Sequence, residues 1–204
     1  MAFTRAAVGA KITSTMYNQL IDAFGTIGLV QVVPSAVTGG SADSTGLVTF
    51  SNAASVLLDG AFTSAYQKFK VEIGLQTLSA AVPWLQLRSG GTTDSSAVYS
   101  KLRLIASGGS ATGTVVQQLA QIRWDMGVAA FAGYNILTLE LANVAQAAPT
   151  VGRARNDATP NPMTTSAGWQ DATVQHSTLA GFDGLAIMAS TGNISGWMKV
   201  YGYA

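Results

Sequence analysis

Residues that could do chemistry are few in this sequence and widely spaced. His176 is the single histidine and there is no cysteine, so the usual Cys and His ligands of zinc cannot be assembled within one chain. The aspartates are scattered without the Asp-x-Asp spacing of a calcium loop. Around Ser195, Asn193 and Trp197 occupy the glycine positions of a nucleophile elbow, and neither a P-loop nor a G-x-G-x-x-G motif occurs. We therefore expect no enzymatic activity, no cofactor and no metal.

Binding is the activity that remains, and aromatic residues could carry it by stacking on sugar rings. Of the four tryptophans, three fall in expected strands, where packing in the core is the ordinary role: Trp84, Trp124 and Trp197. Trp169 lies at the end of a segment rich in Pro and Asn, and it is the aromatic candidate for an exposed contact. A host-surface glycan is the ligand that such a contact would suit.

The segment that ends at Trp169, residues 146–169, is predicted to be a long loop because of its prolines and asparagines. It also carries the Arg153-Ala-Arg155 pair. Long loops are commonly functional or mobile, so two interpretations stay open: a loop that contacts a partner, or an excursion without one. The candidate surface-contact residues are Arg153, Arg155 and Trp169.

The elements that must position these residues are short strands with a period of two. Residues 66–75 are the clearest case, because Phe69, Val71, Ile73 and Leu75 alternate with charged residues. The other expected strands are residues 29–33, 47–50, 55–58, 84–88, 98–105, 115–124, 135–142 and 173–179. In 98–105, Leu102 and Leu104 lie opposite Lys101 and Arg103. Gly and Ser turns separate these strands, with residues 107–113 as one flexible turn. The pattern predicts an all-β, antiparallel β-sandwich or jelly roll.

One helix is expected, near the N-terminus after an irregular arm. Met16, Leu20 and Phe24 recur at a spacing of four, and Gly25 can end the helix. A helix of about ten residues is too short to be stable alone, so it must pack on its own sheet or dock on a neighbouring subunit as an anchor. We expect an N-terminal arm and anchoring helix at residues 1–28 and a β-sandwich domain at residues 29–204.

Residues 182–203 read FDGLAIMASTGNISGWMKVYGY, which predicts a closing hairpin of two strands joined at Gly192-Asn193. This string resembles the C-terminal signature of small β-rich virion subunits of tailed bacteriophages, with its "FDG" element and "GNISG…VYGY" ending. The resemblance extends more weakly over residues 66–103. It implies a structural role in a tail fibre, a tail tip or a head decoration, commonly as a homotrimer, and it brings no catalytic motif with it.

The charge of the chain fits a role in an assembly. Only 11 basic and 10 acidic residues occur among 204, so an isolated monomer would be poorly protected against association. Because basic and acidic residues nearly balance, the chain lacks the excess of basic residues that is typical of nucleic-acid-binding proteins. Arg5 and Lys11 interrupt the apolar stretch that a signal peptide would need, and residues 23–42 contain too many Gly, Pro and Gln residues for a membrane span.

Together these features predict a virion protein made in the cytoplasm of a bacterial host. The expected function is host-surface attachment as a tail-fibre or tail-tip protein. Two alternatives stay open: a capsid decoration protein that stabilises the head in contact with other virion proteins, and a soluble lectin-like binding module.

Overall fold

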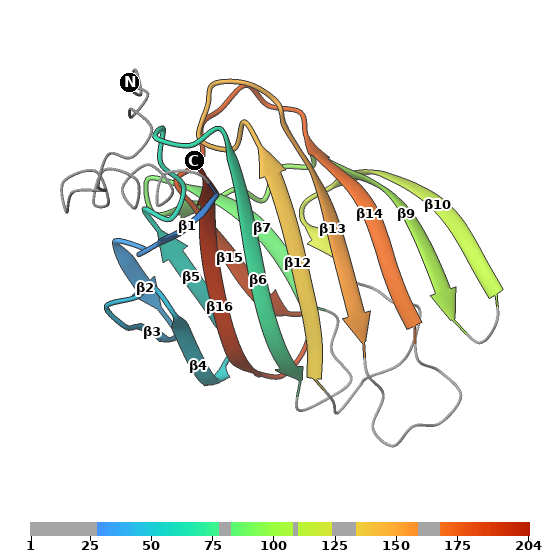
Figure 1. The fold of residues 1–204 in the computed structure, drawn as a ribbon. Coiled ribbons are helices and arrows are strands. Elements are labelled where there is room, and N and C mark those ends of the chain that lie inside the picture. Colours follow the sequence, from blue (N-terminus) through green and yellow to red (C-terminus); the bar gives the residue numbers. More distant parts are fainter. Residues whose placement is uncertain (1–27, 78–82, 108–109, 124–133, 159–167) are drawn as a thin grey trace, which may run out of the picture.

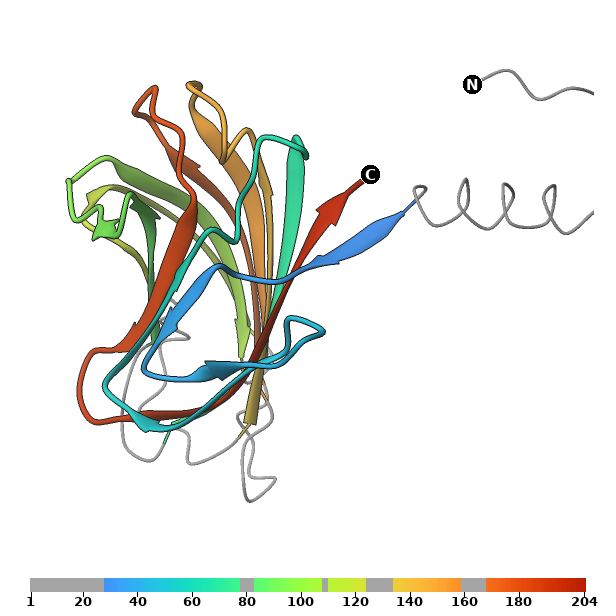
Figure 2. The same cartoon turned by 90° about the vertical axis from the view of Figure 1, so that its left-hand side faces the viewer.

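A computed structural model gives the fold and describes residues 28–77, 83–107, 110–123, 134–158 and 168–204. These residues form two antiparallel β-sheets that face one another, as the edge-on view shows (Figure 2). Every regular element among them is a strand. The expected all-β antiparallel sandwich is confirmed.

The larger sheet has ten strands (Figure 1). Its order is β10 (Ser110–Leu119), β9 (Tyr99–Ser107), β14 (Gly168–His176), β13 (Thr150–Ala158), β12 (Tyr134–Ala142), β6 (Lys68–Thr77), β16 (Ile194–Tyr203), β4 (Val48–Ala53) and β3 (Ser41–Ala42), with β1 (Leu29–Val32) paired to β16. Some neighbours, such as β10 and β9, are consecutive in the chain, whereas β9–β14, β12–β6, β6–β16 and β16–β4 join strands that are distant in sequence. The sheet therefore depends in large part on long-range pairing.

The smaller sheet has six strands, and it covers one face of the larger one. Its order is β11 (Ile122–Arg123), β7 (Pro83–Ser89), β15 (Gly184–Ala189), β5 (Ser55–Asp59) and β2 (Ala36–Thr38), with β8 (Thr92–Thr93) paired to β7.

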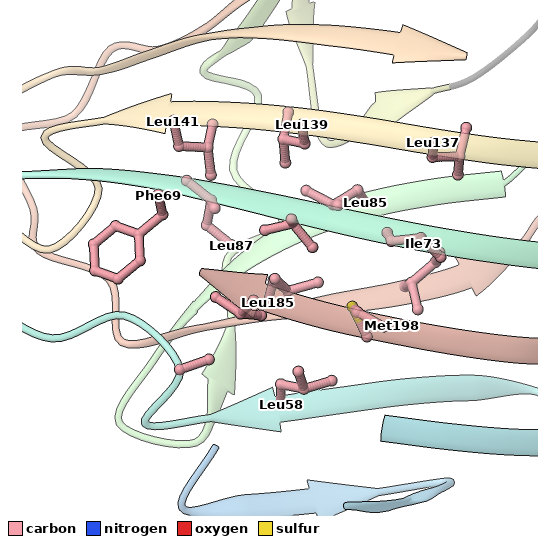
Figure 3. Packing of buried hydrophobic residues seen from close by; sticks show 14 of the residues in the cluster. Leu58, Phe69, Ile73, Leu85, Leu87, Leu137, Leu139, Leu141, Leu185 and Met198 are labelled. Carbon is pink, nitrogen blue, oxygen red and sulfur yellow. The ribbon is translucent and has the colours of Figure 1, made fainter. Parts of the chain in front are cut away.

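The core fills the space between the two sheets (Figure 3). The larger sheet contributes the predicted apolar side of residues 66–75: Phe69, Val71, Ile73 and Leu75 are all 0% exposed. Alternate leucines of β12 extend this surface, and β7 and β15 supply the opposite side. The alternation read from the sequence therefore gives the correct inward face for β6.

The predicted closing hairpin is wrong, although both of its strands exist. β15 pairs with β5 and β7 in the smaller sheet, whereas β16 pairs with β6, β4 and β1 in the larger one. The first four residues of β15 are all buried, so both faces of this strand are covered as well as both of its edges. β16 alternates between buried and half-buried residues, and the turn at Gly192 (φ 71°) carries the chain from one layer to the other.

The predicted long loop over residues 146–169 is also wrong. β13 occupies Thr150–Ala158 and β14 begins at Gly168, so the strand expected at 173–179 starts earlier. Pro149 stands just before β13, whereas Pro160 and Pro162 follow it outside the described residues. The prolines therefore mark the ends of a strand, because proline cannot donate to a ladder in the middle of a sheet.

Two further boundaries differ from the sequence prediction. The flexible turn expected at 107–113 is shorter, since β9 ends at Ser107 and β10 begins at Ser110. The single strand expected at 115–124 is two strands in different sheets, β10 and β11, and a register shift between Val116 and Leu119 ends the regular pairing of β10.

The N-terminal arm and the anchoring helix lie outside the described residues, so Met16, Leu20 and Phe24 stay predictions. In the part of the chain that the structure describes, no helix is long and apolar enough to cross a membrane.

Candidate functional site

The outer face of the larger sheet carries a mixed apolar and polar surface over β10, β9, β14 and β13. Antiparallel register places these residues in two rows that cross the four strands. One row is Val115, Leu102, Thr173 and Arg153, and the other is Gly113, Leu104, Asp171 and Arg155. We call these eight residues the outer patch.

Apolar side chains at one end of the outer patch are unusually exposed. Val115 is 63% exposed, Leu102 56% and Leu104 42%. The inward side of β9 carries Lys101, which is 4% exposed. The alternation of this strand is therefore inverted relative to an ordinary half-buried strand, which presents its apolar side to the core.

At the other end, Arg153 and Asp171 form a bidentate ion pair across β13 and β14. Arg153 Nε lies 2.8 Å and 3.1 Å from the two carboxylate oxygens, and the Nη2 group also donates to Asp171. Hydrogen bonding from Arg153 lowers the pKa of the Asp171 carboxyl, and Arg155 adds to this effect. The Arg153 side chain is 66% exposed, so much of its surface stays accessible to a ligand.

An open depression of about 370 Å³ lies between these two ends. The depression is lined by Leu102, Leu104, Asp171 and Thr173. Gly113 also lines it, and nothing lies within 4 Å of the position that a Cβ of this residue would take. The arrangement offers apolar contact on one side and hydrogen-bonding groups on the other. This combination suits binding, because many ligand sites join an apolar surface to a few placed polar groups.

The three predicted contact residues lie on the neighbouring strands β13 and β14 instead of a loop, and only Arg153 and Arg155 belong to the outer patch. Arg155 pairs in register with Asp171, and Trp169 with Asp157, on β13 and β14. Sequence reasoning missed Asp171, the partner of Arg153, and the exposed leucines of β9. The sequence does show that the leucines of β9 alternate with Lys101 and Arg103, so the two faces of the strand could be predicted. Alternation alone does not say which of the two faces is exposed.

Towards β16, the same outer face is organised differently. Lys68 Nζ lies 2.8 Å from Glu140 Oε2, and the Tyr203 hydroxyl donates to Glu140 Oε1 at 2.9 Å. Lys68 also lies 4.4 Å from the centre of the Tyr203 ring. Lys68 lowers the pKa of the Glu140 carboxyl through its hydrogen bond. These groups bind one another and hold β6, β12 and β16 together, which favours a structural role.

His176 lies inside the sandwich in a second polar cluster. Its ring is 1% exposed, and it packs edge-on against Tyr99 and Phe182 at 4.5 Å and 4.7 Å between ring centres. Nε2 lies 2.8 Å from Asp94 Oδ2, and Nδ1 lies 2.9 Å from the Thr178 hydroxyl. A carboxylate only accepts hydrogen bonds, so the neutral ring carries its proton on Nε2 and accepts from Thr178 at Nδ1.

Thr178, His176 and Asp94 are hydrogen-bonded in the order hydroxyl, imidazole and carboxylate, as in the catalytic triad of a hydrolase. However, the buried ring offers a substrate no access, and both of its nitrogens are already hydrogen-bonded. The cluster instead joins the loop after β8 to the end of β14. This arrangement favours a structural role for His176 at the end of β14.

Stability should depend on pH through His176. Burial lowers the pKa of His176 by more than its bond with Asp94 raises it. For Asp94, burial raises the pKa, but hydrogen bonds from Ser96 and His176 outweigh this and lower it overall. A lowered histidine pKa means that the unfolded chain binds the proton more readily, so this contribution to stability is complete above the unfolded value of 6.5 and declines as the pH falls below it.

We therefore expect the melting temperature to be level above pH 7 and to fall as the pH is lowered below about 6.5. Since His176 is the single histidine, His176→Gln should abolish this slope even if it lowers the melting temperature at every pH. Thermal unfolding of both proteins across the range is the measurement. A wild-type melting temperature that rises on acidification would mean that His176 is charged in the folded protein.

No family model and no curated protein matches the sequence. Among solved structures, the carbohydrate recognition domain of Emp47p is similar at a TM-score of 0.33 and 9% sequence identity, over 87% of this chain and 98% of that domain. A likeness this weak identifies neither a family nor a ligand for this chain.

The FDG element of the C-terminal motif connects three strands of the smaller sheet. The Asp183 amide donates to the Arg88 carbonyl at 3.0 Å, and Phe182 is 3% exposed in the core. At Gly184, an added Cβ would lie 1.9 Å from the Leu58 carbonyl oxygen. Only glycine fits there without displacing β5, so packing explains Phe182 and Gly184.

Arg88 organises the polar end of the same sheet. Its side chain is 6% exposed, with Nε 2.8 Å and Nη2 3.1 Å from the two carboxylate oxygens of Asp59. The remaining donors reach Thr93 Oγ1 and the Gly91 carbonyl, both at 2.6 Å. One guanidinium therefore fixes the β7–β8 turn against the end of β5.

Proposed function

We propose that this chain is a non-enzymatic structural subunit of a tailed-phage virion that attaches the particle to the host surface. The outer patch is the contact surface in this proposal. The observation that carries it is the exposed depression lined by Asp171 and by the uncovered side chains of Leu102 and Leu104, with Arg153 bound to Asp171 next to it.

The chemistry of the outer patch suits a carbohydrate polymer on a cell surface. Sugar rings present apolar C–H faces and rims of hydroxyl groups, which match the leucines and the Arg153–Asp171 pair respectively. The patch lies on paired strands, so little conformational freedom is lost on binding. The virion setting is supported by the resemblance of residues 182–203 to phage subunits and by the low charge of the chain.

The exposed apolar residues also favour a second candidate, a capsid decoration protein. In that role Leu102, Leu104 and Val115 would be covered by neighbouring shell subunits, since exposed apolar surface of this kind commonly marks protein contacts. The two roles place the protein at different sites on the particle.

Antibody labelling of intact phage particles, viewed by electron microscopy, tests the proposal. We expect label at the tail, and we expect phage carrying Thr173→Arg to adsorb to host cells about tenfold less well, as for the loss of ~1.4 kcal/mol of binding free energy. Thr173 is exposed and lines the depression, so a larger side chain should fill the depression without disturbing the core.

The matched control is Lys199→Ala, because Lys199 lies on β16 opposite Glu72, away from the outer patch. This variant should adsorb normally. Label spread over the head would replace attachment by capsid decoration, and absence of label from the particle would refute the virion role. Normal adsorption of the Thr173→Arg phage would exclude the outer patch as the contact surface.

A further inference from the structure

The outermost strand of the larger sheet, β10, has an edge that nothing in the described residues covers. β10 pairs with β9 alone among these strands and lies at the end of the sheet (Figure 1). Its ten residues, SATGTVVQQL, include no charge and no proline. Natural proteins usually protect a free edge with charges, proline, short strands or bulges, and here only the irregularity after Val116 does so.

The shape of β10 is complementary to itself. Val115 projects with 63% of its surface exposed, and two residues before it Gly113 leaves open space. Antiparallel pairing of two copies about a two-fold axis through Thr114 places the partner's Val115 opposite Gly113. Each valine then fills the space above a glycine, and the unpaired backbone groups of both edges find hydrogen-bond partners.

We propose that two copies of this chain pair through β10 in this register, over residues 112–116, and join their larger sheets into one continuous sheet. Gly113 also lines the depression of the outer patch. The partner's Val115 therefore becomes part of the wall of that depression, which is incomplete in a single copy. The two outer patches lie next to each other across the axis and present a doubled surface.

Charge does not oppose this pairing. The nearest charged residue in register is Arg103 on β9, which lies opposite Thr114. Across the axis the two Arg103 backbones are separated by three strand spacings, roughly 14 Å. At this separation their mutual repulsion is weak, because it falls with distance.

The absence of cysteine makes a direct test possible. In the proposed register Thr114 of one copy lies directly opposite Thr114 of the other. The full chain carrying Thr114→Cys should therefore form a disulfide-linked dimer with oxidised glutathione. Thr112→Cys is the matched control. The two cysteines at position 112 would be separated by four residues along the strands, a distance of about 13 Å. That distance exceeds the roughly 7 Å that a disulfide can span. We expect at least tenfold faster cross-linking at position 114.

Light scattering on the unmodified protein gives the second readout. We expect twice the chain mass of 21.0 kDa, whereas the trimer implied by the family resemblance would give three times that mass. A monomer or a trimer at about 100 µM, or equal cross-linking at positions 114 and 112, would overturn the proposal. The pairing does not depend on the virion role, so the localisation experiment can fail while this test succeeds.

Discussion

Replacing Val71 by aspartate should leave the chain unable to fold. Val71 lies in the centre of β6, is 0% exposed, and pairs with Leu139 on one side and Val200 on the other. A carboxylate there has no partner, and burial of an unpaired charge costs several kcal/mol, a large part of the typical total stability of about 5–15 kcal/mol. We expect soluble expression to be lost, as measured by the protein recovered in the soluble fraction.

Glu72→Gln is the matched control, one residue away on the opposite face of β6. Glu72 binds Lys70 at the surface, with 30% of its side chain exposed. Loss of such a pair costs little, commonly less than about 1 kcal/mol, so this variant should be as soluble as the wild type. Equal solubility of the Val71→Asp protein would show that β6 faces the other way.

Arg88→Met should destabilise the sandwich by about 3 kcal/mol, the lower end of the range for breaking a buried ion pair. The side chain of Asp59 is 25% exposed, so water can partly solvate the carboxylate that loses its partner. The variant also frees Thr93 and the Gly91 carbonyl, which hold the β7–β8 turn. Chemical denaturation, followed by tryptophan fluorescence, measures the free energy of unfolding.

The double variant Arg88→Met with Asp59→Asn separates the two sources of this loss. If the unpaired carboxylate dominates, the double variant should recover more than half of the stability lost in Arg88→Met alone. If instead the double variant is less stable than either single one, the contacts to the turn dominate. A single Arg88→Met variant as stable as the wild type would contradict the role assigned to Arg88.

How much of the fold the sequence predicts depends on the strand. In β6, one face carries four apolar residues and the other carries Lys68, Lys70 and Glu72. Only the apolar face can be buried without cost, so its direction could be predicted. In β13 the inward residues are small: Gly152 and Ala154 alternate with Val151, Arg153 and Arg155. Small residues on the inner face give little hydrophobic signal. The alternation is present in the sequence, but the nearby prolines favoured the prediction of a loop.

β9 shows a different limit. A period of two identifies the two faces of a strand, but neighbouring strands decide which of them is covered. The sequence places Leu102 and Leu104 on one face, and the paired sheet exposes them and buries Lys101. For the same reason Arg153 could be selected from the sequence, but its partner Asp171 could not, because that contact exists only once β13 pairs with β14.

The place of β16 in the larger sheet has a consequence for synthesis of the protein. β16 lies between β6 and β4 and also pairs with β1, and the ribosome makes all three of them before it. Until β16 emerges, β6 and β4 both present unpaired edges, and the larger sheet stays divided into two parts. Completion of the sheet must therefore wait for almost the whole of this sequence, and the strand edges left unpaired until then are the kind of surface through which incompletely folded chains aggregate.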